Sequence, residues 1–406
     1  MSFLYSPPDV STCYRPQVFR DYRASTADVE RVLVNVYAAG SLEATFRKEI
    51  TSSASSSAFN FDIDVSPIVA RVAAPNARDL TTIFGSLDTM GAVNNTDVLV
   101  PYYITTDLEI RNTSGLLETV GSSTETSSTL YGLPAIRPLS DVTLNDYYQP
   151  CATGDFLFLT DAPAAQDIGR DESGFISYLS KGINALEVAF YSAAGLQTSA
   201  VINTGNQSSA IGMQTVAIGP AQLEGSGSFT MHNGTLPTSL TAYTYYTLSA
   251  GLYSGSYSRE SEVQTFTLVP SCGWGKRFYW MGRTGGIEQY TFKGQIIEKQ
   301  KDSGDTGQIA PAWDVTTSPP VNSHSRGLIR TDIQQESSLE ITEAVSPTTA
   351  YWLRSIRTSP EVYMEQDGNY IPVIIESGEA TVSQSRAGLI EFKLTVIFDR
   401  ESSQGI

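Results

Sequence analysis

Short runs of alternating apolar and polar residues recur along the chain and indicate β-strands. Residues 59–65 (FNFDIDV) alternate with a period of two, as expected for a strand with one buried face. Runs rich in β-branched and aromatic residues also occupy 32–37, 185–191 and 389–398, and Gly, Ser, Asn and Pro separate them. The pattern predicts a mainly β protein with a few short helices, one of them introduced by Ser66 and Pro67.

Residues 349–377 (TAYWLRSIRTSPEVYMEQDGNYIPVIIES) combine both kinds of pattern. Trp352, Leu353 and Ile356 lie on one side of a helix at about 349–358. Pro360 ends this helix, because the residue before a proline is pushed out of the helical region. Two apolar runs then flank Asp-Gly, which predicts a hairpin at 361–376. We expect a compact α+β unit here.

The turn-rich stretches suggest three domains. Segment 1–160 is a β-rich domain with a Pro-rich arm, and it contains an expected helix at 79–84, strands at 98–104 and 108–110, and an exposed flexible loop at 121–129. Segment 161–297 is a β-sandwich of the fibronectin or immunoglobulin type, with strands that include 240–252, and it ends in an aromatic hairpin at 276–294. Segment 298–406 opens with a polar linker at 298–313 and continues as an α+β domain, with a further strand at 382–385.

Composition and charge exclude several functions. The formal net charge is −17 and Lys and Arg form no cluster, so we expect no nucleic-acid partner. No apolar run approaches the roughly 18 residues of a membrane helix, so no membrane insertion is expected. The N-terminus has no pattern of a signal peptide, which predicts synthesis in a cytoplasm.

The residues that usually carry chemistry show no catalytic or metal-binding arrangement. The two histidines, His232 and His324, lie in Gly/Ser/Asn-rich surroundings that suggest surface loops, without nucleophile or ligand spacing. The glycines at 273–275 and 282–286 are interpreted as turn residues rather than phosphate-binding loops. We therefore predict no catalytic residues, no cofactor-binding residues, no metal site and no cofactor.

Acidic and sulfur-containing side chains are the remaining candidates for a catalytic, calcium-binding or disulfide role. The pairs Asp62/Asp64 and Glu260/Glu262 are each expected on one face of a strand, as in a carboxylate pair of a glycosidase, but the chain is rich enough in acids to create such pairs by chance. The acids at 302–305 are too few for a calcium loop. The three cysteines are expected to be buried structural thiols: Cys13, Cys151 and Cys272.

Tyrosines gather in the middle of the chain and leave two interpretations open. They either present a surface for sugars or proteins, or they lie half-buried on a sandwich face. The residues concerned are Tyr243, Tyr245, Tyr246, Tyr253 and Tyr257.

Three stretches resemble structural proteins of tailed phages that infect Bacteroidetes-like hosts. Residues 30–50 and 58–72 (ERVLVNVYAAGSLEATFRKEI, AFNFDIDVSPIVARV) are similar to the opening β-domain of those proteins. Residues 276–295 (KRFYWMGRTGGIEQYTFKGQ) resemble an aromatic hairpin, and 350–377 resembles a C-terminal unit ending in SPEVY…YIPVII. The sequence departs from these motifs at 281–282, where Leu-Asn is expected, and at 356–357, where paired leucines are expected.

The resemblance implies a virion component of the tail (tail tip, baseplate or hub) that assembles into a ring or larger complex. Its partners would be other virion proteins and copies of itself, contacted through edge strands and through the arms at 6–8 and 401–406. A receptor-binding or carbohydrate-binding fibre protein, with a host surface glycan as partner, is the main alternative. A polysaccharide-degrading tail enzyme and a capsid or spike component are the remaining ones.

Overall fold

The computed structural model describes most of the chain and divides it into two compact units. The described residues are 10–12, 18–24, 29–38, 40–49, 58–76, 84, 92–95, 100–111, 113–114, 116–124, 130–133, 144–147, 155–205, 212–224, 229–309, 327–376 and 388–398. The first unit comprises Met1–Gly273 and Trp280–Gln289, and the second comprises Trp274–Tyr279 and Tyr290–Ile406. The chain passes between the units within a single hairpin.

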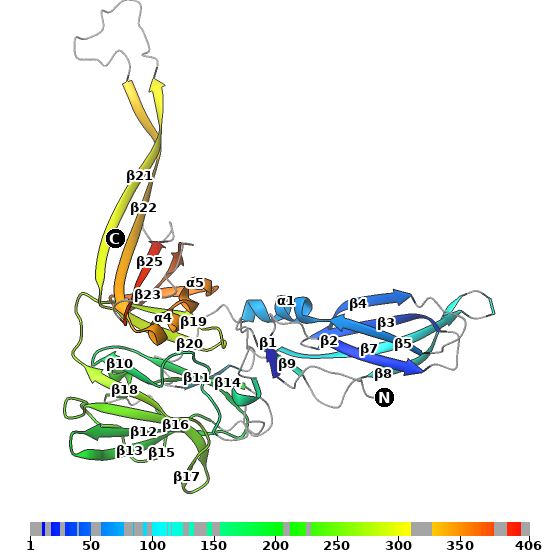
Figure 1. Cartoon of the computed structure of the whole chain (residues 1–406), viewed down its shortest axis with the longest axis horizontal. Coiled ribbons are helices and arrows are strands. Elements are labelled where there is room, and N and C mark those ends of the chain that lie inside the picture. The colour runs from blue at the N-terminus through cyan, green and yellow to red at the C-terminus, as the bar shows by residue number, and fades with distance from the viewer. Residues whose placement is uncertain are drawn as a thin grey trace, which may run out of the picture. The chain divides into compact units, whose positions relative to one another are not determined.

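The N-terminal part of the first unit contains a six-stranded sheet (Figure 1). Its strands follow the order β1-β9-β7-β3-β4, and β8 also pairs with β7. A separate antiparallel pair joins β2 to β5. The bounds of the elements are β1 Val10–Thr12, β2 Val18–Ala24, β3 Val29–Ala38, β4 Ser41–Glu49, β5 Ala58–Asp64, α1 Ser66–Asn76, β7 Val100–Arg111, β8 Leu117–Thr124, β9 Leu130–Leu133 and the 3-10 helix η1 Leu144–Tyr147.

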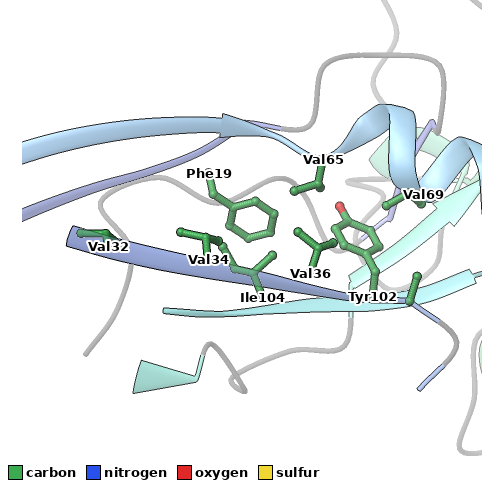
Figure 2. Close-up of a cluster of buried hydrophobic side chains, with 9 residues drawn as sticks. Phe19, Val32, Val34, Val36, Val65, Val69, Tyr102 and Ile104 are labelled. Carbon is green, nitrogen blue, oxygen red and sulfur yellow. The ribbon is translucent and has the colours of Figure 1, made fainter. Parts of the chain in front are cut away.

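A buried cluster holds β2, β3, β7 and the start of α1 together. Figure 2 shows the ring of Phe19 from β2 beside Val34 of β3 and Tyr102 of β7. Between Val32 and Ala38, every second residue of β3 is buried in this core, which is the period of two that alternation in sequence predicts. The cluster consists of Phe19, Val32, Val34, Val36, Ala38, Val65, Val69, Tyr102 and Ile104.

The rest of the first unit is a β-sandwich. Its larger sheet has the order β10-β18-β16-β12-β13-β15, with β17 paired to β16, and its smaller sheet has the order β11-β14-β6. The smaller sheet takes β6 (Ala92–Asn95) from the N-terminal segment of the chain. The other elements are β10 Ala165–Gly169, β11 Phe175–Ser180, β12 Ala185–Ser192, β13 Gly195–Asn203, β14 Gly212–Ala217, α3 Pro220–Leu223, β15 Met231–Asn233, β16 Tyr245–Tyr253, β17 Tyr257–Arg259 and β18 Gln264–Val269.

The C-terminal sheet has seven strands and two short helices. The strand order is β20-β19-β23-β24-β25-β22-β21. Asp367 and Gly368 both have positive φ (51° and 75°) in the tight turn between β23 and β24, the conformation that Asp-Gly favours. The bounds are β19 Lys276–Met281, β20 Ile287–Phe292, β21 Gln295–Ile309, β22 Gly327–Val345, α4 Pro347–Leu353, α5 Ser355–Thr358, β23 Val362–Gln366, β24 Asn369–Ile375 and β25 Ile390–Phe398.

The mainly β fold with a few short helices is confirmed, and several local predictions are corrected. Residues 98–104 and 108–110 do not form two strands, because β7 continues unbroken from Val100 to Arg111. The loop expected at 121–129 begins as strand, since β8 extends to Thr124. The strand expected at 240–252 starts only at Tyr245. The polar linker expected at 298–313 is wrong up to Ile309, where β21 ends.

Other predictions lie outside the described residues. These are the Pro-rich arm, the tail at 401–406, the strand at 382–385, Cys13, Cys151, His324 and, apart from Phe84, the helix at 79–84.

Candidate assembly surfaces

A long two-stranded ribbon, β21–β22, extends beyond the other strands of its sheet (Figure 1). β22 pairs with β25 only from Ser338 to Val345, whereas its pairing with β21 continues out to Gly327. Within the described chain, the outer part of the ribbon therefore pairs only with itself over about 35 Å, at 3.3 Å per residue. Two strands paired in this way are marginally stable in water and expose backbone donors and acceptors along both edges. A strand of another chain can therefore pair with the outer part of the ribbon.

The base of the ribbon, in contrast, is firmly fixed. The Glu343 carboxylate of β22 accepts hydrogen bonds from the Tyr290 hydroxyl at 3.0 Å and from the backbone N–H of Lys293 at 2.9 Å. Gly294 approaches β22 so closely that a Cβ there would lie 2.2 Å from the Thr342 carbonyl oxygen. The ribbon β21–β22 is therefore held at its base, while its outer part pairs with no other described strand, as in an arm that projects from a domain.

Helices α4 and α5 pack beside this base. The hydroxyl of Ser346 caps α4 by accepting the N–H of Thr349 at 3.1 Å. Trp352 is 2% exposed, and its ring meets Tyr290 edge-on at 5.7 Å between centroids. The sequence places Trp352, Leu353 and Ile356 on one side of a helix, and all three are buried. The helical segment breaks at Arg354, which separates α4 from α5.

A polar cluster connects β19, β20 and β23 in the same sheet. The Tyr279 hydroxyl donates to Glu365 at 2.5 Å, while Arg277 donates to the Tyr279 oxygen at 3.0 Å and to the Thr291 hydroxyl at 2.7 Å. Burial raises the pKa of Tyr279 well above its ordinary value of 10.0. The tyrosine therefore stays neutral and donates, so the cluster holds strands together.

The tyrosines of the sandwich divide between its core and its surface. Tyr246 is fully buried, and its hydroxyl donates to the Ile218 carbonyl at 2.7 Å. The other four are partly exposed. Tyr245 lies opposite Tyr191 on β12, and their rings stack at 4.6 Å with 4° between planes. Leu196 of β13 lies opposite Tyr191 and is 58% exposed, so the three side chains form a half-exposed apolar row.

Asp64 and Glu262, two of the acidic residues considered as members of catalytic pairs, accept hydrogen bonds from the backbone, and Asp62 and Asp64 both lie in β5. Asp64 accepts the N–H of Ser66 at the start of α1 at 2.9 Å. Glu260 and Glu262 do not share a strand face, because β17 ends at Arg259 and an isolated bridge at Ser261 follows. Glu262 accepts the N–H of Phe158 at 2.9 Å, and burial raises the pKa of its carboxyl group.

The remaining candidates from the sequence also have structural partners. His232 is not in a loop but in β15, where it stacks on Tyr253 at 4.6 Å and lies 3.2 Å from the Asn184 carbonyl oxygen. The glycines at 282–286 form the hairpin turn, with Gly285 at a φ of 86°. Cys272 is a free, partly exposed cysteine rather than a fully buried one. The acids at 302–305 lie in β21, not in a loop.

Two glutamates with structural roles were not singled out from the sequence. One is Glu343 at the base of the ribbon. The other is Glu288, which is 3% exposed and accepts the Thr160 hydroxyl and the Asp161 N–H, each at 2.8 Å. Both lie in strands, and the residues beside them in the sequence show no periodic pattern that would predict a buried acid. An acid inside the aromatic run 287–292 is the only sequence hint that Glu288 is buried.

Neither a metal site, a membrane-spanning helix nor a similar protein gives this chain a function. Across the residues that the structure describes, no group of three or more His, Cys, Asp or Glu side chains is placed to hold a metal ion. None of the described helices has the length and apolar character needed to cross a membrane. No protein-family model matches the chain, and no curated protein matches it.

Proposed function

We propose that this chain is a non-enzymatic structural component of a phage virion, located in the tail (tail tip, baseplate or hub). In this proposal the ribbon β21–β22 is the arm with which the chain joins copies of itself or other virion proteins. The observation that carries it is the outer part of the ribbon, which is paired only with itself in the described chain although its base is held by Glu343.

Three features support assembly as the function of the ribbon. Its edges offer backbone hydrogen bonds to a strand of another chain, which is a recurrent mode of recognition. Its length gives it reach, and repeated head-to-tail contacts of this kind close into rings. Two of the three stretches that resemble phage structural proteins border the ribbon: the hairpin similarity runs to residue 295, and the C-terminal similarity begins at 350.

The structure provides a precise deletion to test this role. Lys299 and Ser338 are directly opposite partners in the ribbon, so Asn-Gly can replace residues 300–337 as a two-residue hairpin turn. We expect this variant to keep the circular dichroism spectrum of the folded protein but to lose assembly. Assembly is measured by sedimentation velocity over a range of concentrations and by negative-stain imaging for discrete rings.

A matched control removes the connection but keeps the ribbon. Ile309 and Gly327 are also opposite partners, so Asn-Gly can replace residues 310–326. This variant should assemble like the full chain. The proposal for the ribbon is wrong if the variant lacking 300–337 assembles normally, or if the full chain stays monomeric at every concentration. Placement in the tail is wrong if immunogold labelling of virions of the encoding phage gives no signal there.

A second candidate function is binding of a host surface glycan. The row formed by Leu196, Tyr191 and Tyr245 favours it, because half-exposed aromatic rings suit contacts that are partly apolar and partly wet. Glycan-array binding that Tyr191→Ser abolishes, with assembly unchanged, would support this candidate. Absence of any binding by the full chain would contradict it.

A further inference from the structure

A small cavity lies inside the first unit, where the tip of the hairpin β19–β20 meets the sandwich. Its volume is about 10 Å³. Polar groups from four strands line it: Gln166 of β10, Ser177 of β11, Gln264 of β18 and Glu288 of β20. Thr160, which donates to Glu288, and Gln289 also belong to the polar lining. A polar cavity of this size is a different environment from the apolar core beside it.

Gln264 lines this cavity with an acceptor that the protein does not satisfy. The residue is 2% exposed, and its side-chain oxygen Oε1 has no hydrogen-bond partner in the protein. A buried acceptor without a donor costs roughly 1–3 kcal/mol, and such groups are rare in native proteins. A donor in the cavity would remove this cost.

The orientation of the Gln264 amide is fixed by its neighbour. Its side chain forms a hydrogen bond with the Glu262 carboxylate; after the hydrogen bond from the Phe158 N–H, this is the second interaction that opposes the rise in the pKa of Glu262 caused by burial. An ionised carboxylate only accepts hydrogen bonds, so it requires the amide nitrogen of Gln264. Rotating the amide would turn Oε1 towards the carboxylate, which is unfavourable. Oε1 therefore remains as the acceptor that needs a donor.

Several of the other polar groups that line the cavity already form hydrogen bonds of their own, so they are not free to donate to Oε1. Thr160 donates to Glu288, and the Ser177 hydroxyl shares a hydrogen bond with Thr215 at 3.0 Å. The Gln289 amide bonds to both backbone groups of Phe175. Gln166, the remaining polar residue of the lining, is partly exposed and does not donate to Oε1 either, so a water molecule is the candidate donor. An ordered water needs roughly 10–15 Å³ of room and two to four polar partners.

We propose that this cavity is a binding site for a single ordered water molecule, which donates to Gln264 Oε1 and joins the hairpin tip to the sandwich. The side chains of Gln166 and Glu288 in the lining offer the water further hydrogen-bond partners. The site is independent of the ribbon and of assembly. It adds an internal hydrogen-bonded link within the first unit, beside the one that Glu288 makes to Thr160 and Asp161.

The test is a crystal structure of the full chain at about 1.8 Å or better, together with the same crystal form of Gln264→Leu. In the wild-type protein we expect one density peak within hydrogen-bond distance of Gln264 Oε1 and of a second polar lining group. In Gln264→Leu the peak should be absent. The wild-type map alone decides the matter if the variant fails to fold.

Three wild-type results would overturn the proposal. One is a cavity without density. Another is an amide turned so that its nitrogen faces the cavity. The third is a peak with several ligand distances near 2.4 Å, which would indicate a cation instead. Neutron diffraction of the wild-type crystal shows directly which protons point at Oε1 and gives an independent reading of the donor.

Discussion

Replacing Trp352 tests whether the helix–hairpin unit at 347–375 is held together by a buried aromatic core. Trp352 is 2% exposed, lies in α4 and meets Tyr290 edge-on. Phe292 and Phe392 stack nearby in the same sheet, with ring centroids 5.9 Å apart. Trp352→Ala removes an entire indole ring from this packing and leaves a cavity behind.

The expected cost follows from the area that the ring buries. An aromatic side chain of this kind buries about 150–250 Å², and apolar area is worth roughly 25 cal/mol per Å². Because the alanine recovers only part of this area and the cavity closes only in part, the expected loss is about 3–5 kcal/mol of unfolding free energy. The neighbouring Tyr351 is 52% exposed in the same helix, so Tyr351→Ala is a matched control. Its expected loss is below about 1 kcal/mol.

The assay must follow the second unit by itself, because a protein with two units need not unfold in one step. Urea titration followed by circular dichroism is combined with hydrogen exchange and mass spectrometry of peptides from 347–376 and 388–398. We expect Trp352→Ala to lower the protection of both peptides and Tyr351→Ala to leave it nearly unchanged. A loss below about 1 kcal/mol for Trp352→Ala, or equal losses for the two variants, would refute the core position of the ring.

Two further predictions concern the first unit. Gly286→Ala should lower the melting temperature and cost about 1–3 kcal/mol of unfolding free energy, because its Cβ would lie 2.1 Å from the Leu159 carbonyl oxygen. Gly273→Ala is the control, since its Cβ would meet nothing within 4 Å and the change should be neutral. Equal melting temperatures for the two variants would contradict this prediction. Burial raises the pKa of Glu262 in the folded protein above the ordinary glutamate value of 4.5. The folded protein therefore loses stability as the pH rises above 4.5 and this carboxyl group ionises. Glu262→Gln should therefore gain melting temperature relative to wild type between pH 4.5 and 8, and a decreasing difference would show that the hydrogen bond from the Phe158 N–H dominates instead.

Elements with one face in a core could be predicted from the sequence. Alternation in 59–65 and 389–398 corresponds to β5 and β25, because burial on one face imposes a period of two. The Asp-Gly turn between β23 and β24 and the apolar side of α4 are equally local signals. In these places a few neighbouring residues contain all the information that the conformation requires.

The linker prediction at 298–313 is wrong up to Ile309 because that segment shows no alternation of apolar and polar residues. Its polar composition resembles that of a loop, although its backbone pairs with β22. The same limit applies to Glu343 and Glu288. Their partners lie 50 and about 128 positions away along the chain, at Lys293 and Thr160, and no local pattern records them.

By itself, the sequence determined the fold class, the strands that border a core and the turns between them, because these depend on side-chain burial and local backbone preference. Only the tertiary structure decided which strands join. It placed β6 in the smaller sheet of the sandwich, made the polar segment at 298–309 part of a strand, and separated Glu260 from Glu262. Such choices depend on hydrogen bonds between backbone groups distant in sequence, and every residue except proline carries the same backbone donor and acceptor.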